Sequence, residues 1–354
     1  MNMPGINISF TEKAATAIQR GERGIIAMII KGTVPAKNPL EILSAADIPS
    51  TFSAANKKQI ENALKGYINT PKKVIVYCLG TSAEDYTEAL SALELVKFNY
   101  LVAPSCETDE QTDAIASWVG AKREEGKKIK AILPNSASDK EYIINYTTES
   151  VIDEDGTTYT TEQYCSRIAG IIAGTPLSIS CTYAPLAELV DCTRLSKVEM
   201  DAAVAAGELI VYHDGEKVKL ARGITSLTTT TQEKGEQFQK IKIVDCMDMI
   251  TDDVTRTVED NYIGKYANSY DNKCVLISAI SNYFDSLVKS SILSSYSVGI
   301  DKAANKEWLD LHGYKTEEMS DDEIKQANTG DKVFLVASVK ILDAIEEVTL
   351  PISI

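Results

Sequence analysis

Between Gly24 and Leu133 the sequence alternates short apolar runs with longer segments of mixed polarity, and no other feature constrains the fold as strongly. Short runs rich in β-branched residues are typical of buried strands, and the longer segments are typical of helices. The expected strands cover residues 25–30, 74–79, 100–103 and 128–133, and the expected helices cover residues 54–67, 81–96 and 108–125. Strands and helices that alternate at these lengths predict an α/β fold with a mainly parallel sheet flanked by helices.

Several helix starts are marked by capping boxes. In this pattern a Ser or Thr hydroxyl accepts from the amide three residues on, and a Glu side chain reaches back. The pattern occurs at Thr81–Glu84 and at Ser196–Glu199, and a short helix is expected to start at Ser320. A helix of small and apolar residues, suited to close packing, is expected over residues 160–173, and another helix over residues 271–293. Helices are therefore expected along the whole chain.

The composition is that of an acidic globular protein, with 354 residues, 44% hydrophobic and 25% charged residues, and a formal net charge of −15. A nucleic-acid-binding surface needs clustered Lys and Arg to displace counterions, so this charge argues against nucleic acid as a partner. Local basic clusters occur at Lys122-Arg123 and at Lys127, Lys128 and Lys130. They are expected to be solvated, or to meet acidic faces of neighbouring subunits in a polymer.

Targeting and redox signals are weak in this sequence. The N-terminus shows no basic segment followed by an apolar run, so no signal peptide is expected. The longest apolar run, residues 24–30, is far too short to span a bilayer, which argues against direct membrane insertion. The seven cysteines are scattered and form no C-x-x-C motif. They are expected to be reduced, mostly buried thiols of a protein made in the cytoplasm.

No recognised catalytic, cofactor-binding or metal-binding constellation is found in the sequence. His213 lies at the tip of a predicted hairpin and His312 follows a predicted helix, and neither has ligands at metal-binding spacing. The acidic turn around Asp153 lacks the spacing of a calcium loop. Gly80-Thr81 lies between a strand and a helix, where phosphates often bind, but no phosphate-loop motif accompanies it. We expect no enzyme and no cofactor, and an α/β nucleotide-binding enzyme is the alternative.

The stretch from Gly207 to Lys273 is the most informative part of the chain. Asp214-Gly215 between two β-rich runs predicts a hairpin, because a type I′ turn needs positive φ at both central residues. Residues 221–231 are rich in β-branched residues and are expected as a strand. A further short strand is expected from Phe238 onward, running into an amphipathic helix that reaches Tyr262.

The order of short runs in this stretch carries a family resemblance. The runs are Asp214-Gly215, Ala221-Arg222-Gly223-Ile224, Ser226-Leu227-Thr228-Thr229, Lys240-Ile241-Lys242-Ile243-Val244, Met247-Asp248-Met249-Ile250 and Glu259-Asp260-Asn261-Tyr262-Ile263-Gly264-Lys265. Further runs are Trp308-Leu309, Asn328-Thr329-Gly330 and Ala337-Ser338-Val339-Lys340-Ile341-Leu342-Asp343-Ala344. In this order they resemble the contractile tail sheath proteins of phages and of phage-tail-like (R-type) bacteriocins. The resemblance is strongest from Ala184 to Leu350.

Both ends of the chain alternate apolar and polar residues, as a strand with one apolar face does. The apolar residues are Ile6, Ile8 and Phe10 at one end and Val348, Leu350, Ile352 and Ile354 at the other. Each end is expected either as a strand of its own domain or as an arm that pairs with another subunit, because an exposed apolar strand invites pairing. The resemblance implies the second possibility, in which both arms join a small sheet in neighbouring subunits.

The resemblance also implies a division of the chain. Residues 1–20 would be the N-terminal arm, residues 21–236 the α/β sheath core with a subtilisin-like sheath domain at about 96–236, residues 237–344 an α+β C-terminal assembly domain, and residues 345–354 the C-terminal arm. The acceptor sheet for the arms would contain Val333, Leu335, Ala337, Val339 and Ile341.

The function implied by the resemblance is mechanical. Subunits would polymerise helically around an inner tube and contract to drive the tube through a target cell envelope. The implied partners are further copies of the chain, the inner tail tube protein, and baseplate and terminator proteins. The protein would be made in the bacterial cytoplasm and assembled into a virion or phage-tail-like particle released by lysis. A second rival is another self-assembling baseplate or shell component, which the same apolar ends would suit.

Overall fold

The computed structural model of this protein describes residues 16–353. These residues divide into two compact units, and each is described by itself. The core unit contains residues 21–251 and 343–353, and the terminal unit contains residues 16–20 and 252–342. The four-part domain division expected from the sequence stays a prediction.

The core unit is built on a sheet in which seven strands of the described chain lie side by side. In spatial order they are β10 (Glu208–Leu209), β6 (Ile143–Tyr146), β5 (Lys130–Pro134), β4 (Tyr100–Val102), β1 (Ile25–Lys31), β3 (Lys73–Leu79) and β2 (Leu40–Ile42). Every neighbouring pair is parallel except β2 and β3, which are antiparallel. The mainly parallel sheet predicted from the sequence is confirmed.

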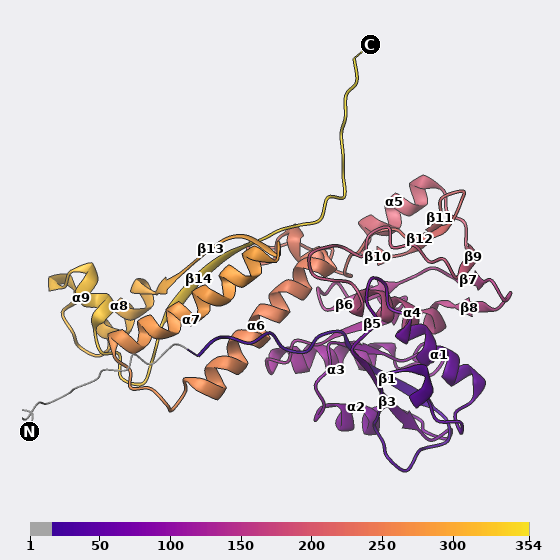
Figure 1. The fold of residues 1–354 in the computed structure, drawn as a ribbon, viewed down its shortest axis with the longest axis horizontal. Helices are drawn as coiled ribbons and strands as arrows, with labels where there is room; N and C mark the ends of the chain where they lie inside the picture. The colour runs from indigo at the N-terminus through magenta and orange to yellow at the C-terminus, as the bar shows by residue number, and fades with distance from the viewer. Residues whose placement is uncertain (1–15, 354) are drawn as a thin grey trace, which may run out of the picture. The chain divides into compact units, whose positions relative to one another are not determined.

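Helices cover both faces of this sheet (Figure 1). Successive side chains of a strand point to opposite faces. The even-numbered residues of β1 lie in the core on the side of α1 (Ala54–Leu64) and α4 (Thr161–Ala173). Odd-numbered residues of β1 lie in the core on the side of α2 (Thr87–Leu93) and α3 (Thr112–Glu124). Burial on both faces is the reason that these strands are continuous apolar runs.

Helices α1 and α4 approach each other closely at a glycine. A Cβ atom at Gly170 of α4 would lie 2.3 Å from the carbonyl oxygen of Ala63 in α1, which is closer than any real Cβ contact. Because only glycine lacks this atom, Gly170 allows the two backbones to meet. The helix of small residues predicted over residues 160–173 is confirmed.

Smaller elements flank the main sheet in the core unit. Strands β8 (Thr158–Thr160), β7 (Ser150–Asp153) and β9 (Leu189–Cys192) form an antiparallel sheet in that order. Strands β11 (Val211–His213) and β12 (Val218–Leu220) form a hairpin. Helix α5 (Lys197–Ala205) and the 3-10 helices η1 (Ala45–Asp47) and η2 (Glu236–Gln239) lie in the connections.

The terminal unit is an α+β arrangement of helices and one two-stranded ribbon. Its elements are the end of α6 (Ile241–Asn261), then α7 (Tyr270–Lys289), β13 (Leu293–Ile300), α8 (Lys302–Leu311), η3 (Thr316–Glu318), α9 (Asp321–Gln326) and β14 (Leu335–Ile341). Strands β13 and β14 pair antiparallel along their whole lengths, and in Figure 1 they run beside α7.

Of the helix starts predicted at Thr81, Ser196 and Ser320, the last two are confirmed and the first is wrong. Ser196 begins α5 and Ser320 begins α9, each with both capping contacts present. Thr81 does not begin α2, which starts at Thr87. The N-cap residue of α2 is Tyr86, whose side chain makes no capping hydrogen bond, and the Asp85 carboxylate before it accepts from the Thr87 amide at 2.9 Å.

Two other helix boundaries differ from the prediction. Helix α3 starts at Thr112 and not at residue 108. The amide and the hydroxyl of Thr108 donate to the Glu162 carboxylate of α4, at 3.0 and 2.5 Å, and this long-range contact replaces a local cap. Helix α7 ends at Lys289, because residue 293 already begins β13.

The hairpin predicted at Asp214-Gly215 is confirmed, but the type I′ turn is wrong. His213 pairs with Val218, so residues 214–217 form a longer loop. Within this loop only Gly215 has positive φ, at 107°. The Asp214 carboxylate accepts from two amides of the loop, each at 2.9 Å, and so stabilises a turn that a local dipeptide rule does not describe.

Two strands predicted around this hairpin are absent from the described structure. Residues 221–231 form no strand. Instead, the amides of Thr228 and Thr229 donate to the Asp139 carboxylate at 2.6 and 2.9 Å. The residues before α6 form the 3-10 helix η2, which leads directly into α6. The amphipathic helix predicted to reach Tyr262 is confirmed, since α6 ends at the preceding residue.

Candidate assembly surfaces

The predicted acceptor residues lie on or beside the β13–β14 ribbon. Leu335, Ala337, Val339 and Ile341 belong to β14, whereas Val333 precedes the strand. Within residues 16–353, neither outer edge of the ribbon pairs with a third strand. Such edges present rows of N–H and C=O groups to another chain. The ribbon has the geometry of a strand acceptor, and its use as one stays a prediction.

Helix α7 supports one face of this ribbon. The rings of Phe284 in α7 and Tyr296 in β13 lie 5.3 Å apart, and the Tyr296 hydroxyl donates to Asp285 at 2.8 Å. Leu293 is buried at the start of β13, while Val336 of β14 is 52% exposed. A two-stranded ribbon alone is marginally stable in water, so the packing on α7 stabilises it.

The predicted C-terminal arm has no strand partner in the described structure. Val348, Leu350 and Ile352 are 80%, 74% and 78% exposed, and residues 345–353 form no helix or strand. Figure 1 shows this last part of the chain as an extended trace. Ile354 lies outside the described residues. The use of this segment as an arm stays a prediction.

The predicted N-terminal arm residues Ile6, Ile8 and Phe10 also lie outside the described residues. The segment that follows them is held by the terminal unit. The Tyr262 hydroxyl donates to the Thr16 carbonyl at 3.3 Å, and Ile18 is buried. Arg256 donates to the Gln19 carbonyl at 2.9 Å, and Arg20 donates to Ser290 at 2.9 Å. These contacts hold residues 16–20 on the rest of the terminal unit.

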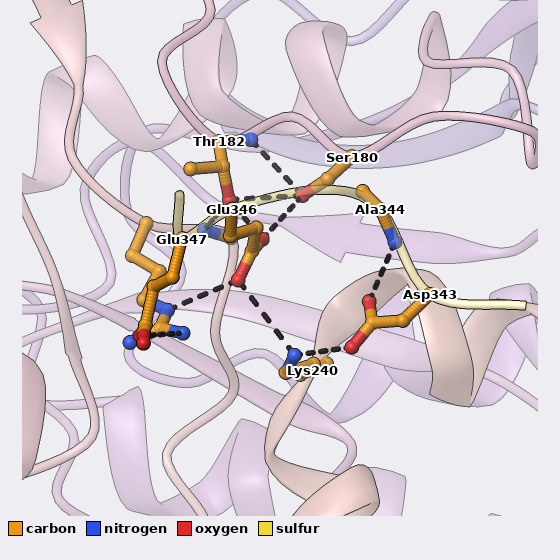
Figure 2. Close-up of polar contacts among 9 residues, drawn as sticks. Ser180, Thr182, Lys240, Asp343, Ala344, Glu346 and Glu347 are labelled. Carbon is orange, nitrogen blue, oxygen red and sulfur yellow. Dashed lines mark hydrogen bonds and ion pairs between the residues drawn. The ribbon is translucent and has the colours of Figure 1, made fainter. Parts of the chain in front are cut away.

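The root of the C-terminal segment is bound to the core unit through Glu346 (Figure 2). Its Oε1 atom accepts from the Thr182 hydroxyl at 2.6 Å and from the Ser180 hydroxyl at 3.2 Å. Its Oε2 atom lies 3.1 Å from Arg222 Nε and 3.7 Å from Lys240 Nζ. We call these four partners the Glu346 socket. The Glu346 side chain is only 8% exposed.

A cluster of buried charges joins the first half of α6 to the sheet. Lys130 of β5 lies 3.0 Å from Asp245 and also forms an ion pair with Asp248, one turn along α6. Arg123 donates to Asp248 twice, at 2.9 and 3.1 Å. The Tyr100 hydroxyl of β4 donates to Asp245 at 2.6 Å. Because buried charges are costly unless paired, this cluster holds α6 in one position on the sheet.

The cluster shifts the pKa values of Asp248 and Tyr100. Burial acts to raise the pKa of the Asp248 carboxyl, but Lys130 and Arg123 outweigh burial and hold that pKa below its usual range. Burial, together with the Asp245 carboxylate, raises the pKa of the Tyr100 hydroxyl. The Asp248 carboxylate is therefore charged and the Tyr100 hydroxyl neutral near pH 7.

The sequence did not predict this cluster, and its expectation for the basic residues was wrong in part. Lys130 is 1% exposed and Lys122 is 8% exposed, so neither is solvated. Lys122 instead forms ion pairs with Glu94 and Glu125, at 2.9 and 2.8 Å. The sequence did contain one signal for this cluster. Asp245 and Asp248 are three residues apart in a predicted amphipathic helix, so their side chains share one face, and the helical period assigns that face to the buried side.

Comparison with known proteins identifies the family to which this chain belongs. The sequence profile of the phage tail sheath protein central domain matches residues 80–226, and that of the phage tail sheath C-terminal domain matches residues 233–354. The tail sheath protein of Clostridium phage phiCD119 is 41% identical over 354 residues, covering 98% of this chain and 97% of that protein. The chain belongs to the phage tail sheath family. The family resemblance and the sheath function predicted from the sequence are confirmed.

Solved structures agree with this membership at the level of the fold. The sheath tail protein of Desulfitobacterium hafniense superposes with a TM-score of 0.72 at 22% identity, over 84% of this chain and 93% of that one. The anti-feeding prophage helical sheath in its contracted state also gives a TM-score of 0.72, at 15% identity, over 100% of this chain and 99% of that one. The α/β fold class is therefore shared with sheath proteins.

In this sheath protein the residues that could suggest chemistry have structural contacts. His213 accepts from the Gly215 amide at 3.0 Å, and His312 stacks on Trp308 with ring centroids 3.7 Å apart. The Asp153 carboxylate accepts from two turn amides at 2.9 and 3.1 Å, as a turn residue does. Among residues 16–353, no group of three His, Cys, Asp or Glu side chains is placed to hold a metal ion.

The remaining candidate for ligand binding is a groove of about 800 Å³ in the core unit. It lies between α5, the β11–β12 hairpin and the segment 221–227. Its charged lining residues include Lys197, Asp201, Arg222 and Lys240. They offer charges of both signs.

Six of the seven cysteines are buried and all seven are free thiols, as expected from the sequence. None of the helices within residues 16–353 combines the length and apolar character needed to span a bilayer.

Proposed function

We propose that this sheath protein polymerises helically around an inner tube through strand exchange, and contracts to drive the tube through a target cell envelope. The observation that supports this most directly is that one chain carries both halves of a strand junction. The β13–β14 ribbon has unpaired edges within the described residues, and Val348, Leu350 and Ile352 form an exposed apolar segment. An extended segment that adds to a sheet edge is held by main-chain hydrogen bonds, with side-chain pockets for specificity.

The energy of such a junction suits a polymer that must rearrange. A strand of about six residues makes roughly four to six hydrogen bonds worth about 0.5–1.5 kcal/mol each, so one junction contributes a few kcal/mol. Repetition over a lattice makes the assembly strong without making any one junction rigid. Extended linkers between folded units absorb the rotation and sliding of subunits while the junctions persist.

The energy for contraction is stored in the assembled lattice, so the mechanism needs no nucleotide and no enzymatic step. The relatives named above are sheath proteins, and this supports a structural role. The strand–helix alternation alone favoured the nucleotide-binding alternative. The nucleotide-binding alternative needs a helix that starts directly after Gly80, where its amides could bind a phosphate. Helix α2 begins only at Thr87.

The partners follow from this role. They are further copies of the chain, the inner tail tube protein, and baseplate and terminator proteins, without nucleic acid and without direct membrane insertion. The subunit is made in the bacterial cytoplasm, enters a virion or phage-tail-like particle, and is released by lysis. The four-part division into two arms, a sheath core and an assembly domain is proposed together with this role.

Electron microscopy of the purified full-length protein tests the proposal. Hollow helical tubes are the expected result. Closed shells or rings would instead support a baseplate or shell component. Lone particles at high protein concentration, together with measurable nucleotide binding, would contradict the sheath role and favour the enzyme alternative.

A further inference from the structure

The C-terminal arm is attached to its own subunit in an unusual way. Within residues 345–353, Glu346 is the only side chain that is not exposed. Its neighbour Ile345 is 89% exposed, and the apolar residues after it are also exposed. A segment that docked on its own subunit would bury its apolar side chains and leave its charges in water. In this segment the Glu346 carboxylate is buried and the apolar side chains are exposed. The attachment is therefore polar, and the apolar side chains stay available to contact another chain.

The Glu346 socket is held in shape by contacts of its own. The Thr182 amide donates to the Ser180 hydroxyl at 3.1 Å, and the Gly223 amide donates to the Thr182 hydroxyl at 3.0 Å. A Cβ atom at Gly223 would lie 2.7 Å from the Cys181 sulfur, so the backbone can come this close only at a glycine. These contacts orient both hydroxyl groups toward the carboxylate. The socket is therefore a built site with fixed donors.

Two flanking contacts support the same root. Asp343 forms an ion pair with Lys240, and Glu347 lies 3.2 Å from Arg222 Nη2. The Glu347 side chain is 82% exposed, so its ion pair is weak. Figure 2 shows the Glu346 carboxylate between the two hydroxyl groups and the Lys240 ammonium, with Glu347 to one side. Glu346 is the contact in this group that combines burial, charge pairing and two hydroxyl donors.

We propose that Glu346 is a positioning residue for assembly, which anchors the root of the C-terminal arm and sets the point and direction from which residues 348–354 reach a second copy of this chain. The inference rests on the proposed strand exchange. With the anchor closed, the free arm is the seven residues 348–354, which span at most about 25 Å. With the anchor open, residues 344–354 become free, which is eleven residues and a reach of about 40 Å.

The longer tether weakens each junction. The effective concentration of a tethered segment falls roughly as the −3/2 power of tether length once the tether exceeds the span, so eleven free residues in place of seven lower it about twofold. Loss of a defined exit direction lowers it further. Because every subunit in a lattice makes this junction, the effect is repeated along the polymer. The concentration needed for tube assembly should therefore rise by at least about twofold.

The test compares Glu346→Ala with Glu347→Ala in the full chain. Both variants remove one carboxylate from adjacent positions, so they change the net charge equally, and only Glu346 occupies the socket. A nitroxide at Ile345→Cys, in a Cys274→Ser background, reports the mobility of the root, because the other six cysteines are buried. Sedimentation and electron microscopy give the concentration at which tubes form. Thr182→Val removes the shortest hydrogen bond to the carboxylate and is a second variant with the charge intact.

The expected result is a more mobile nitroxide and a raised assembly concentration for Glu346→Ala, with smaller changes in the same direction for Thr182→Val. Glu347→Ala should match the parent protein in both measurements. Equal behaviour of the two alanine variants would overturn the proposal, and so would a mobile root with unchanged assembly. If the parent protein forms no tubes, the strand-exchange function fails, whereas the nitroxide spectra still show whether Glu346 anchors the root.

Discussion

At the scale of single residues, this sheath protein uses buried charge to fix positions. Lys130 and Asp248 lie in the interior, where an ion pair is weak support for stability but strong support for one geometry. Asp248 belongs to α6, so the pair ties that helix to strand β5. Glu346 applies the same chemistry to the C-terminal arm. In both places a carboxylate meets cations that come from distant parts of the chain, and at Glu346 two hydroxyl groups also donate.

Replacing Asp248 with Asn should destabilise the unassembled subunit by about 3 kcal/mol near neutral pH, since Arg123 loses its carboxylate partner and Lys130 keeps only Asp245. The folded-state pKa of Asp248 is lowered, so its contribution is fully present above the unfolded value of about 3.9 and is lost as the pH falls through the folded value. The difference in free energy of unfolding between parent and variant should therefore narrow below about pH 4.

Urea unfolding, followed by circular dichroism from neutral pH to about pH 3, measures this difference. The matched control is Glu216→Gln, which removes an exposed carboxylate from the loop between β11 and β12. It should follow the parent protein within about 0.5 kcal/mol near neutral pH. A gap between Asp248→Asn and the parent that stays constant over the whole range would show that Asp248 does not couple folding to pH.

At the scale of elements, the two helices on one face of the core sheet are set by a single close approach. Gly170 of α4 meets the backbone of Ala63 in α1, with no room for a side chain. Packed interiors do not yield easily to added atoms, because their density matches that of organic crystals. The spacing of α1 and α4 over the sheet therefore depends on one residue without a Cβ.

Gly170→Ala should lower the free energy of unfolding by about 1–3 kcal/mol, as overpacking does, even though alanine favours a helix more than glycine. Gly80→Ala is the matched control, because a Cβ atom at Gly80 would meet nothing within 4 Å. That control should stay within about 0.5 kcal/mol of the parent protein. Thermal or urea unfolding measures the free energy of unfolding of both variants. Equal values would refute the role of Gly170 in the close approach of α1 and α4.

At the scale of the whole molecule, the core sheet and the proposed assembly strands differ in how completely they are covered. The sheet is covered on both faces, while the ribbon edges and the C-terminal apolar segment have no strand partner within residues 16–353. A chain of this kind can fold by itself and still offer donor and acceptor strands to further copies.

Truncation after Glu347 should give a folded subunit that forms no tubes, because it removes the free arm and keeps the Glu346 socket. Leu350→Asp should impair assembly far more than Thr349→Asp, since successive residues of a strand point to opposite faces. Electron microscopy and sedimentation measure the tubes, and urea unfolding checks that each variant is folded. Tubes of normal length from the truncated chain would show that residues 348–354 are not needed as a donor strand for assembly.

The sequence by itself determined the parts of this protein that depend on local periodicity. Apolar runs between Gly24 and Leu133 predicted a mainly parallel sheet flanked by helices, and the order of runs after Asp214 predicted the sheath family. The capping box at Ser196 and the helix start at Ser320 were also predicted correctly. These features succeed because strand period, helix period and these two helix starts depend mainly on neighbouring residues.

Only the tertiary structure decided the features that need partners from distant segments. Thr108 binds Glu162 instead of capping its own helix, Thr228 binds Asp139 instead of extending a strand, and Lys130 enters the core because Asp248 meets it there. The Glu346 socket likewise gathers residues from three separate stretches. A polar side chain takes whichever partner the fold brings near, and that choice is a property of the folded chain, since no local pattern encodes it.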